Sequence, residues 1–412
     1  MRETVKNNCQ LLEEGEFSLP KGRAVKKLGE VCEIRNGGTP KTGNKEYWNG
    51  GIKWITPKDL GKLNDIYVAD TLRKISEIGL QKSSAKIIPK NSIILSTRAP
   101  IGYIAINTLE MATNQGCRGI IPSNKIIEKY LFYFLRNSVN LLNDLGVGTT
   151  FKELSTKALA SVQIPVPSLP EQKRIVAILD RTFKAIDQAK TNTEQNLKNA
   201  KELFESYLQG VFSDRKWSIV KLDDVCEKVE YGSSSKSSDE GCMPVLRMGN
   251  IQNGRFMWDD LKYSNNEEDN EKYLLNYNDV LFNRTNSPEL VGKTAIYKSE
   301  MPAIFAGYLI RIRRKKDLLN ADYLNYYLNS QMAKNYGYTV VISSVNQANI
   351  NGKKLKTYPI PLPPIEKQEQ IVKELDSLSS EIIKLSNIYQ SKLANIAELK
   401  KSILQKAFTG DL

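Results

Sequence analysis

A few short segments of this 412-residue sequence carry residue types that enzymes use for chemistry. Asp144-Leu145-Gly146-Val147-Gly148 has the spacing of the D-x-G-x-G loop with which methyltransferases bind S-adenosylmethionine. It follows a polar helical stretch at residues 136–143, however, where that fold requires a buried strand. The Asn-Pro-Pro-Tyr or Asp-Pro-Pro-Tyr tetrapeptide of such enzymes is also absent from the sequence. We therefore predict no methyltransferase site.

Two other patterns come close to enzyme motifs. Gly292-Lys293-Thr294 has the spacing of the end of a P-loop, but Ser287 stands where that phosphate-binding loop requires its first glycine. Triplets such as Asp260-Leu261-Lys262 and Glu398-Leu399-Lys400 are too common in sequences to indicate a nuclease. We therefore predict no catalytic residue and no ATPase, methylase or nuclease site in this chain.

The absence of histidine narrows the chemistry further. It removes the Ser-His-Asp triad, the His-paired cysteine nucleophile, the HExxH zinc site and the usual general base near neutral pH. The five cysteines form no Cys-x-x-Cys pair, and this scattered arrangement is typical of reduced packing residues. They are Cys9, Cys32, Cys117, Cys226 and Cys242. We therefore expect no metal site.

The charge balance favours a polyanionic partner. Lys and Arg total 59 against 46 Asp and Glu, which gives a formal net charge of +13 and a pI of about 9.2. Charge alone does not identify DNA. No run approaches the roughly 18 apolar residues of a membrane span, and residues 1–20 contain no apolar core of a secretory signal. We therefore predict a cytoplasmic chain that does not enter a membrane.

An internal repeat sets the organisation that must position any binding residues. The segment at residues 164–176 recurs at residues 360–372, with the shared pattern Ile-Pro-x-Pro, then Gln, then Ile-Val. Upstream segments repeat more loosely: residues 28–33 return at 222–227, 130–135 at 323–328, and 96–98 at 282–284. The order is therefore A, B, A′, B′. Because the B segments repeat more closely, we infer that they share one task while the A segments have different ones.

Each B segment predicts a long helix. It opens with a proline-rich extended stretch and continues for about forty residues without proline and nearly without glycine. Apolar residues spaced alternately by three and four predict a coiled-coil seam between the two helices. The predicted pairing residues are Ile175, Leu179, Ile186, Leu203, Tyr207, Ile371, Leu375, Leu378, Ile382, Leu385, Tyr389, Ile396, Leu399 and Ile403. The alternative is that each helix packs independently on its own domain.

Connectivity makes the predicted helix pair antiparallel, because the first helix leaves the first A domain and ends at the second. A helix over residues 171–212 would be roughly 60 Å long. That length corresponds to up to about two turns of a DNA duplex. We therefore predict an α+β chain in which two mixed α/β domains are separated by two long antiparallel coiled-coil helices, as a pseudo-twofold internal repeat.

The predicted domain boundaries follow from this repeat. They are 1–163 for the first α/β domain, 164–214 for the first helix, 215–359 for the second α/β domain and 360–412 for the second helix. Short apolar runs at residues 93–95, 103–106 and 308–312 predict strands. One helix is expected in each α/β domain, near residues 125–142 and 320–336, each followed by a polar loop at 146–152 or 343–349.

These features together resemble the DNA-specificity subunit of type I restriction-modification enzymes. The motifs that carry the resemblance are Gly37-Gly38-Thr39-Pro40, Tyr47-Trp48, Trp54-Ile55, Asn114-Gln115-Gly116, Gly148-Thr149-Thr150-Phe151 and the doubled helix entrance. Each motif alone is weak, but their doubled order from about Lys26 to Leu412 is specific. The second half departs from the pattern, with Tyr231-Gly232-Ser233-Ser234 at the first loop and Gly307 without Asn-Gln. We interpret this difference as a different target half-site.

The resemblance implies a division of labour. Each A domain would be a target recognition domain that reads one half of a bipartite site in double-stranded DNA. The helices would set the spacing and dock two methyltransferase subunits, with restriction/translocase subunits joining the same complex. This chain itself would bind no cofactor, whereas S-adenosylmethionine, ATP and Mg would belong to the partner subunits.

Candidate DNA contacts follow from residue chemistry within the loops that carry the resemblance. Lys and Arg suit phosphates, and loop Arg, Asn, Gln, Ser and Thr suit base edges. The candidates are Thr39, Lys41, Trp54, Lys58, Arg98, Gln115, Arg118, Thr150 and Lys152 in the first domain and Ser234, Lys236, Arg247, Asn250, Arg284, Asn346 and Gln347 in the second. Trp54 could equally be a core residue, and Arg98 or Arg284 could serve an internal salt bridge.

The sequence therefore predicts a non-catalytic DNA-recognition subunit. The main alternative is a coiled-coil protein-interaction scaffold without sequence-specific DNA binding, in which the positive charge is incidental. A self-contained nuclease is a third possibility, which would require metal-dependent cleavage by this chain alone. A steep loss of duplex binding with salt would distinguish the first reading from the scaffold.

Overall fold

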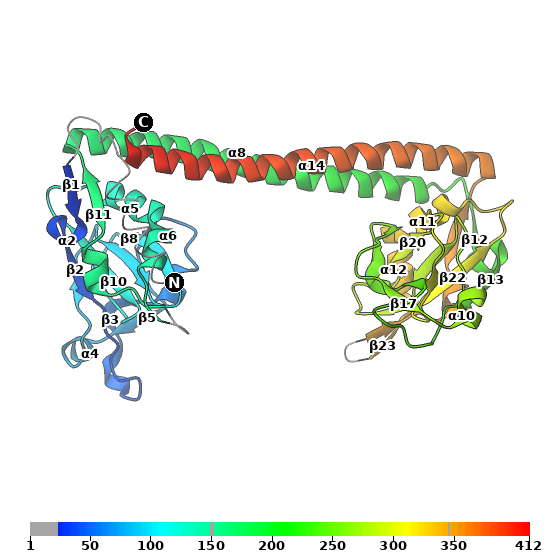
Figure 1. Cartoon of the computed structure of the whole chain (residues 1–412), viewed down its shortest axis with the longest axis horizontal. Helices are drawn as coiled ribbons and strands as arrows, with labels where there is room; N and C mark the ends of the chain where they lie inside the picture. Colours follow the sequence, from blue (N-terminus) through cyan, green and yellow to red (C-terminus); the bar gives the residue numbers. More distant parts are fainter. Residues whose placement is uncertain (1–23, 149–151, 345–346) are drawn as a thin grey trace. The chain divides into compact units, whose positions relative to one another are not determined.

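The computed structural model describes residues 24–148, 152–344 and 347–412 (Figure 1). The chain divides into two compact units, of which unit 1 comprises residues 1–192 and 392–412 and unit 2 comprises residues 193–391. Each unit therefore contains one α/β part and a segment of each long helix, α8 (Leu169–Phe212) and α14 (Ile365–Thr409). None of the described helices is both long and apolar enough to span a membrane.

The α/β part of unit 1 is built on two sheets. The five-stranded sheet has the order β2 (Cys32–Asn36), β10 (Cys117–Pro122), β7 (Ile93–Thr97), β8 (Ile101–Asn107) and β4 (Tyr67–Val68). The four-stranded sheet has the order β5 (Arg73–Ile75), β3 (Trp48–Ile55), β9 (Met111–Thr113) and β6 (Ile87–Ile88). The predicted strands at residues 93–95 and 103–106 are thus present. All five residues of β7 are buried, as its continuous apolar sequence favours for a central strand.

Short helices complete unit 1. They are α2 (Leu28–Val31), η1 (Lys45–Tyr47), α3 (Pro57–Leu60), α4 (Glu77–Gln81), α5 (Glu128–Asn137), α6 (Val139–Asp144) and α7 (Thr156–Ala160). Helix α5 lies between the five-stranded sheet and the long-helix segment (Figure 1), and its residues 130–135 are all buried. The strand β1 (Ala24–Lys27) pairs with β11 (Gln163–Val166) just before α8 begins.

Unit 2 repeats this plan with smaller sheets. The principal sheet has the order β13 (Cys226–Tyr231), β22 (Leu309–Arg314), β18 (Val280–Asn283) and β20 (Thr294–Ile296), and β22 contains the predicted strand at 308–312. Two three-stranded sheets follow the orders β17 (Lys262–Ser264), β14 (Met243–Leu246), β21 (Ile304–Phe305) and β19 (Thr285–Asn286), β24 (Gln347–Asn349), β23 (Ile342–Ser344). Two-stranded pairs join β12 (Ser218–Lys221) to β25 (Pro359–Leu362) and β15 (Ile251–Gln252) to β16 (Arg255–Phe256).

The helices of unit 2 are α9 (Leu222–Val225), η2 (Met248–Asn250), α10 (Glu267–Lys272), α11 (Ala321–Asn329), α12 (Gln331–Val340) and α13 (Gly352–Leu355). The prediction of one helix near 125–142 and one near 320–336 is wrong in detail, because each is two helices. The break falls at Ser138 and Ser330, whose hydroxyls bond backbone carbonyls of the preceding turn at 2.9 and 2.6 Å. Such local side-chain bonds compete with continuation of a helix.

Backbone hydrogen bonds align the two α/β parts residue by residue. The Thr97 amide donates to the Gly116 carbonyl at 2.8 Å, and the Arg284 amide donates in the same way to the Tyr308 carbonyl at 3.0 Å. Arg284 therefore stands at the position of Thr97 and not of Arg98. The predicted match of residues 96–98 with 282–284 is wrong by one residue, since the strand ladder, and not the shared arginine, sets the register.

A fully buried glutamine joins each α/β part to the start of its long helix. The Gln172 side-chain nitrogen donates to the carbonyls of Lys125 and Pro167, both at 2.9 Å, and its oxygen accepts from the Ile127 amide at 2.9 Å. Gln368 repeats this arrangement on α14 with the carbonyls of Leu318 and Pro363 and the amide of Asn320, at 2.8, 2.9 and 2.8 Å. Each glutamine thus satisfies three backbone groups that burial would otherwise leave unpaired.

Tyrosines strengthen the same joint in both units. The hydroxyls of Tyr130 and Tyr323 donate to the carbonyls of Pro165 and Pro361, each at 2.8 Å. The hydroxyls of Tyr133 and Tyr326 donate to the carboxylates of Asp180 and Asp376, each at 2.6 Å. Burial, together with the hydrogen bond to the carboxylate, raises the pKa of Tyr133 and of Tyr326 above the usual range. Both tyrosines therefore stay protonated and remain donors at neutral pH.

In each unit, the C-terminal end of one long helix packs on aromatic side chains of the α/β part. In unit 1, Phe408 of α14 packs on the rings of Tyr130 and Phe134 at centroid distances of 5.2 and 5.5 Å. In unit 2, Phe212 of α8 packs on Tyr323 and Tyr327 at 5.3 and 5.2 Å. Tilted and edge-to-face contacts of this kind add to the stabilisation from burial alone.

The long-helix segments within each unit run antiparallel. In unit 1, Arg174 donates to the Leu412 carbonyl at 2.8 Å and Lys400 pairs with Asp187 at 2.6 Å. In unit 2, the Tyr207 hydroxyl donates to Glu374 at 2.6 Å. Of the predicted pairing residues, Ile175, Leu179, Ile186, Ile371 and Leu375 are buried, whereas Leu378, Ile382, Tyr389, Ile396 and Ile403 are half-buried.

The predicted seam is wrong at Leu203, Leu385 and Leu399, which are 57%, 38% and 50% exposed. Tyr207 is also 38% exposed, although its hydroxyl bonds Glu374 of α14. Phe204 and Leu208, which follow Leu203 and Tyr207 on α8, face the core of unit 2 instead. A helix with 3.6 residues per turn drifts away from a strict 3.5-residue repeat, so a seam extrapolated from one end loses its register toward the other.

The glutamine joint generates a stability prediction. Replacing Gln172 with Ala leaves one amide and two carbonyls buried without partners, so we expect the free energy of unfolding to fall by about 3 kcal/mol. Urea unfolding of the purified chain measures this change. Gln188→Ala is the matched control, because Gln188 is exposed on the same helix and its side chain bonds Asn192, four residues further along that helix. An equal effect of both variants would contradict the role of Gln172.

Unit 2 contains an ion cluster that generates a pH prediction. Burial alone would raise the pKa of Glu230, but hydrogen bonds from Lys228 and Arg313 and the charge of Arg311 outweigh it and lower the pKa to about 2. Arg311 is only 1% exposed and bonds Glu230 at 2.9 Å. Because the folded-state pKa is depressed, this contribution to stability is complete above the ordinary glutamate pKa of 4.5 and is lost as the pH falls toward 2.

Glu230→Gln should therefore lower the free energy of unfolding by about 2 kcal/mol at pH 7, where the ionised form acts. The difference between this variant and the wild type should shrink as the pH falls from 4.5 toward 2. Urea midpoints measured across that range provide the test. Glu227→Gln, an exposed position on the same strand, is the control. A difference that is independent of pH would show that the glutamate charge is not the cause.

Candidate nucleic-acid interface

The glycine-rich loop at residues 37–41 of unit 1 is fixed by its neighbours. A Cβ atom at Gly37 would lie 1.8 Å from the Asn114 carbonyl, so only glycine fits at this crossing. The Gly38 amide donates to the Thr113 carbonyl at 2.9 Å. The indole of Trp54 donates to the Gly38 carbonyl at 2.9 Å, and the indole of Trp48 donates to the carbonyl of Lys41 at 3.3 Å. Both ends of the loop are thereby held.

Two predicted contacts meet on this loop. The Thr39 hydroxyl donates to the side-chain oxygen of Gln115, which joins the Gly37–Lys41 region to the Asn-Gln-Gly segment. The side-chain nitrogen of Gln115 has no hydrogen bond among the described residues and can donate to a base. Lys41 and Lys58 are exposed nearby in sequence, and Lys58 lies in α3, whose start is capped by Thr56 and Asp59. Hydroxyl, amide and ammonium groups of this kind suit base edges and phosphates.

Trp54 itself belongs to the core. Its side chain is 2% exposed. The N–H group of the indole, the one polar group of this ring, donates to the Gly38 carbonyl. The prediction of a direct base contact is therefore corrected for Trp54, because no surface of the indole remains for a ligand. The residue acts instead by positioning the loop, in agreement with the core alternative weighed from the sequence.

The predicted arginines of unit 1 divide between surface and interior. Arg118 is 8% exposed and donates to the carbonyl of Gln115 at 2.7 Å and to the Thr156 hydroxyl at 3.1 Å. Its guanidinium also lies 3.5 Å from Glu153, which Arg98 approaches at 3.9 Å. The prediction that Arg118 contacts DNA is therefore corrected, because its side chain holds the Gln115 segment in place. Arg98, with 49% of its side chain exposed, can still reach a phosphate.

The remaining predicted residues of unit 1 are Lys152 and Thr150. Lys152 is exposed and donates to the Asn143 carbonyl at 3.4 Å, a long hydrogen bond that leaves its other hydrogens available. Thr150 lies outside the described residues, so its assignment stays a prediction.

Unit 2 builds its first loop on the same backbone frame with other side chains. The Ser233 amide donates to the Phe305 carbonyl at 2.9 Å, as Gly38 does to Thr113. A Cβ at Gly232 would lie 2.2 Å from the same Phe305 carbonyl, so glycine is again required. The buried Ser233 hydroxyl donates to Asp269, and this bond, with one from Ser235, lowers the pKa of that carboxyl. Ser234 and Lys236 are exposed beyond this anchor.

Arg247 and Asn250 form a structural turn. The Asn250 side chain is 3% exposed, accepts from the Arg247 amide at 2.9 Å and donates to the Asp259 carbonyl at 2.9 Å. Asn250 is therefore corrected from a base contact to a turn residue. Arg247, with 30% of its side chain exposed, donates to the Asp260 carbonyl at 2.7 Å and pairs with that carboxylate at 3.3 Å.

Arg284 is the best-placed predicted contact of unit 2. Its guanidinium lies 4.8 Å from the ring centre of Tyr231, and its Nε donates to the Gly307 carbonyl at 3.0 Å. The sequence also allowed an internal ion pair for Arg284, but no carboxylate among the described residues pairs with it. Gln347 is exposed on β24, whereas Asn346 lies outside the described residues and stays a prediction.

Sequence reasoning missed one exposed arginine in unit 1. The guanidinium carbon of Arg73 lies 3.7 Å from the ring centre of Trp48 and 5.1 Å from that of Trp54. Arg73 lies in a short strand without a recognisable motif, and only the paired tryptophans of the resembling segment gave any signal that an aromatic cluster stood nearby. Its neighbour Leu72 is 81% exposed.

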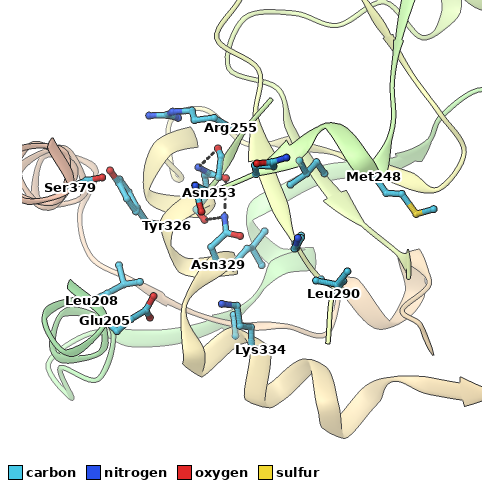
Figure 2. Close-up of a pocket in the computed structure, with 18 of the residues that line it drawn as sticks. Glu205, Leu208, Met248, Asn253, Arg255, Leu290, Tyr326, Asn329, Lys334 and Ser379 are labelled. Atoms are coloured by element: carbon cyan, nitrogen blue, oxygen red, sulfur yellow. Dashed lines mark hydrogen bonds between the residues drawn. The ribbon is translucent and has the colours of Figure 1, made fainter. Parts of the chain in front are cut away.

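A separate groove of about 1520 Å³ opens in unit 2 (Figure 2). Tyr326 and Asn329 of α11 and Lys334 of α12 line one side, while Glu205 of α8 and Ser379 of α14 approach from the long helices. Its lining includes both ammonium and carboxylate groups, so it has no single sign of charge. Arg247 is the one predicted contact that borders it among the residues described.

The candidate residues as a group offer cations, amides and hydroxyls at fixed loops. No cluster of three or more His, Cys, Asp or Glu side chains suited to a metal occurs among the described residues. Such a surface can neutralise phosphates and donate to or accept from base edges, which are the two elements of sequence-specific DNA binding.

Comparison with known proteins assigns this chain to a family. A family model described as the type I restriction modification DNA specificity domain matches residues 20–199 and residues 214–393. The type I restriction enzyme MjaIX specificity subunit of Methanocaldococcus jannaschii is 35% identical over 258 residues, which are 57% of this chain and 60% of that protein. The EcoKI specificity subunit of Escherichia coli K12 is 27% identical over 358 residues, which are 81% of this chain and 77% of that protein.

Solved structures share the fold. A chain from a structure of a type I R-M system matches with a TM-score of 0.75 at 23% identity, covering 96% of this chain and 99% of that one. The HsdS subunit from Thermoanaerobacter tengcongensis matches with a TM-score of 0.63 at 22% identity, covering 97% and 100%. With two matches of the family model that together span most of its length, this chain belongs to the type I restriction-modification DNA specificity family.

Proposed function

We propose that this chain is the DNA-recognition subunit of a type I restriction-modification complex in the cytoplasm. It reads a bipartite site in double-stranded DNA, one half with each α/β part, and is itself non-catalytic. The relatives that it resembles are named as specificity subunits of type I restriction enzymes, which supports this assignment.

The observation that carries the proposal is one loop frame with two sets of side chains. Gly38 and Ser233 are held by equivalent backbone hydrogen bonds, and both loops require a glycine at the preceding crossing. The polar groups on this shared frame differ, however, with Thr39 and Gln115 in unit 1 and Ser234 and Arg284 in unit 2. A conserved frame with different donors and acceptors suits two readers of two different short sequences.

The exposed cations would supply most of the affinity. The net charge of +13 favours a polyanion, and Lys41, Lys58, Lys152 and Lys236 are exposed beside the loops. Neutralising phosphates with such groups releases counterions from DNA, so binding should weaken steeply as salt rises. A protein-interaction scaffold with incidental charge would not show that dependence on duplex DNA.

The long helices are proposed to dock two methyltransferase subunits, through which restriction/translocase subunits join the complex. Several apolar side chains on these helices are exposed, which is typical of a surface that a partner covers. They include Leu203, Ile383, Leu385, Ile388 and Leu399. The partners would hold S-adenosylmethionine, ATP and Mg, and this chain would position them on DNA.

The proposal is tested by recovering the tagged chain with its partners and selecting bound duplexes from a randomised pool at moderate salt. Two short enriched motifs at one fixed spacing, together with a co-purifying methyltransferase, are expected. A pool without any enriched sequence, and a complex without a methyltransferase, would reject the proposal in favour of the scaffold.

The loop lysines generate a quantitative prediction. The double variant Lys41→Ala/Lys58→Ala should weaken binding by a similar factor for matched and mismatched duplexes, because phosphate contacts carry no sequence information. The slope of log affinity against log salt should fall by about one for each lost contact. Titrations at several salt concentrations measure both quantities. Lys184→Ala, an exposed lysine of α8, is the control, and an unchanged slope in the double variant would exclude these lysines as phosphate contacts.

A further inference from the structure

Arg73 of unit 1 is held by two tryptophans. It lies on β5 directly opposite Trp54 of β3, and the irregularity in this strand pair places Trp48 opposite Ile75, two residues along β5 from Arg73. The two indole rings meet edge to face, with centroids 5.2 Å apart. The guanidinium covers the Trp48 ring at 3.7 Å and lies 5.1 Å from the Trp54 ring.

The backbone beneath Arg73 is fixed as well. The buried Thr71 hydroxyl donates to the Arg73 carbonyl at 2.7 Å and accepts from the Trp54 amide at 3.0 Å. An arginine on an exposed strand end normally samples many rotamers, and ordering it on binding costs free energy. Here the stacking and the Thr71 bonds place the guanidinium before any ligand arrives, which lowers that cost.

The donors of Arg73 remain available. Asp70, the nearest carboxylate in sequence, pairs with Lys74 at 3.3 Å. Within the parts of the chain that the structure describes, the Arg73 guanidinium forms no ion pair and no hydrogen bond. The side chain is exposed, so the edge of the fork that points away from the rings can meet a ligand. A planar fork with free, parallel N–H groups recognises two acceptors side by side.

The same tryptophans place Arg73 beside the reading loop. Trp54 donates to the Gly38 carbonyl and Trp48 to the Lys41 carbonyl, so the rings that contact Arg73 also hold the loop one residue before and two residues after Thr39. The two indole rings therefore link Arg73 to the loop that carries Thr39.

We propose that Arg73 reads a guanine in the half-site recognised by unit 1, donating from its guanidinium to O6 and N7 in the major groove. Guanine is the base that presents two adjacent acceptors there, which matches a fixed fork. A phosphate would need only the charge and would not require the orientation that the two tryptophan rings impose. The inference rests on the proposed function and adds to it a specificity-determining residue and the base that this residue reads.

Unit 2 also has an arginine that lies over an aromatic ring, but fewer of its N–H donors are available. Arg284 lies over Tyr231, but its Nε is already bound to the Gly307 carbonyl. Arg73 stands on a different element and keeps its whole fork. The two half-sites are thus expected to differ, and the guanine assigned to Arg73 belongs to unit 1 alone.

The test compares Arg73→Lys with the wild type in the complex with its methyltransferase partner. Lysine keeps the charge but loses the fork. Selection from a pool randomised in both half-sites should give the wild type one position with strong guanine preference that Arg73→Lys flattens by about tenfold or more. The other positions, the second half-site and the salt slope should stay unchanged. An intact second half-site in the same molecules also shows that the variant is folded.

Two further variants sharpen the result. Trp48→Leu keeps Arg73 but removes the ring at 3.7 Å, so guanine preference at the same position should weaken while binding persists. Arg136→Lys is the matched control, since Arg136 also lies over an aromatic ring, that of Phe132, at 6.0 Å, but belongs to helix α5 and not to the segments at residues 37–41 or 114–116. It should leave every position of the selected motif unchanged.

Two outcomes would overturn the assignment while leaving the proposed function intact. If Arg73→Lys retains every base preference, Arg73 does not read a base. If Arg73→Ala weakens all duplexes equally and lowers the salt slope by about one, the residue contacts a phosphate. A wild-type complex that enriches no bipartite sequence would instead overturn the proposed function, and the guanine assignment with it.

Discussion

The architecture depends on two buried glutamines, Gln172 and Gln368. Each is completely buried and closes three backbone hydrogen bonds between an α/β part and the first turn of a long helix. A buried amide that bonds two carbonyls and one amide fixes both direction and distance, which apolar packing alone does not. The Tyr130 and Tyr323 hydroxyls complete the same joint, so each helix leaves its α/β part in a set direction.

This joint allows the rest of each α/β part to change. The loops at residues 37–41 and 232–236 make none of the hydrogen bonds of Gln172 and Gln368, so their side chains can differ without weakening those bonds. The frame of the first loop is nevertheless the same in both units, because Gly37 and Gly232 pass so close to a neighbouring carbonyl that any side chain would collide with it. The backbone frame that both units share and the side chains in which they differ therefore lie within a few residues of each other.

The sequence predicted the doubled α/β and long-helix plan because periodicity and repeats are local signals that survive divergence. It did not predict the break of each helix at Ser138 and Ser330, which depends on one hydroxyl bond, or the seam beyond Leu203, where small deviations from the ideal repeat accumulate. For the candidate site it identified the loops and weighed a core position for Trp54, but it did not predict the burial of Arg118 and Asn250. Residue type alone does not tell whether a polar atom is already used by a neighbouring carbonyl.

Arg73 shows why such a residue escapes a motif search. Its proposed role depends on Trp48 and Trp54, which stand far from it in sequence and reach it through the pairing of β3 with β5. The tryptophans were visible as a motif, but the arginine that completes the stack is defined by strand register. Because Trp48 and Trp54 also hold Gly38 and Lys41, a change in either ring alters the loop and the arginine together. With the proposed role of Arg73, specificity in unit 1 depends on this shared aromatic support, and substitutions of exposed side chains alone alter only part of it.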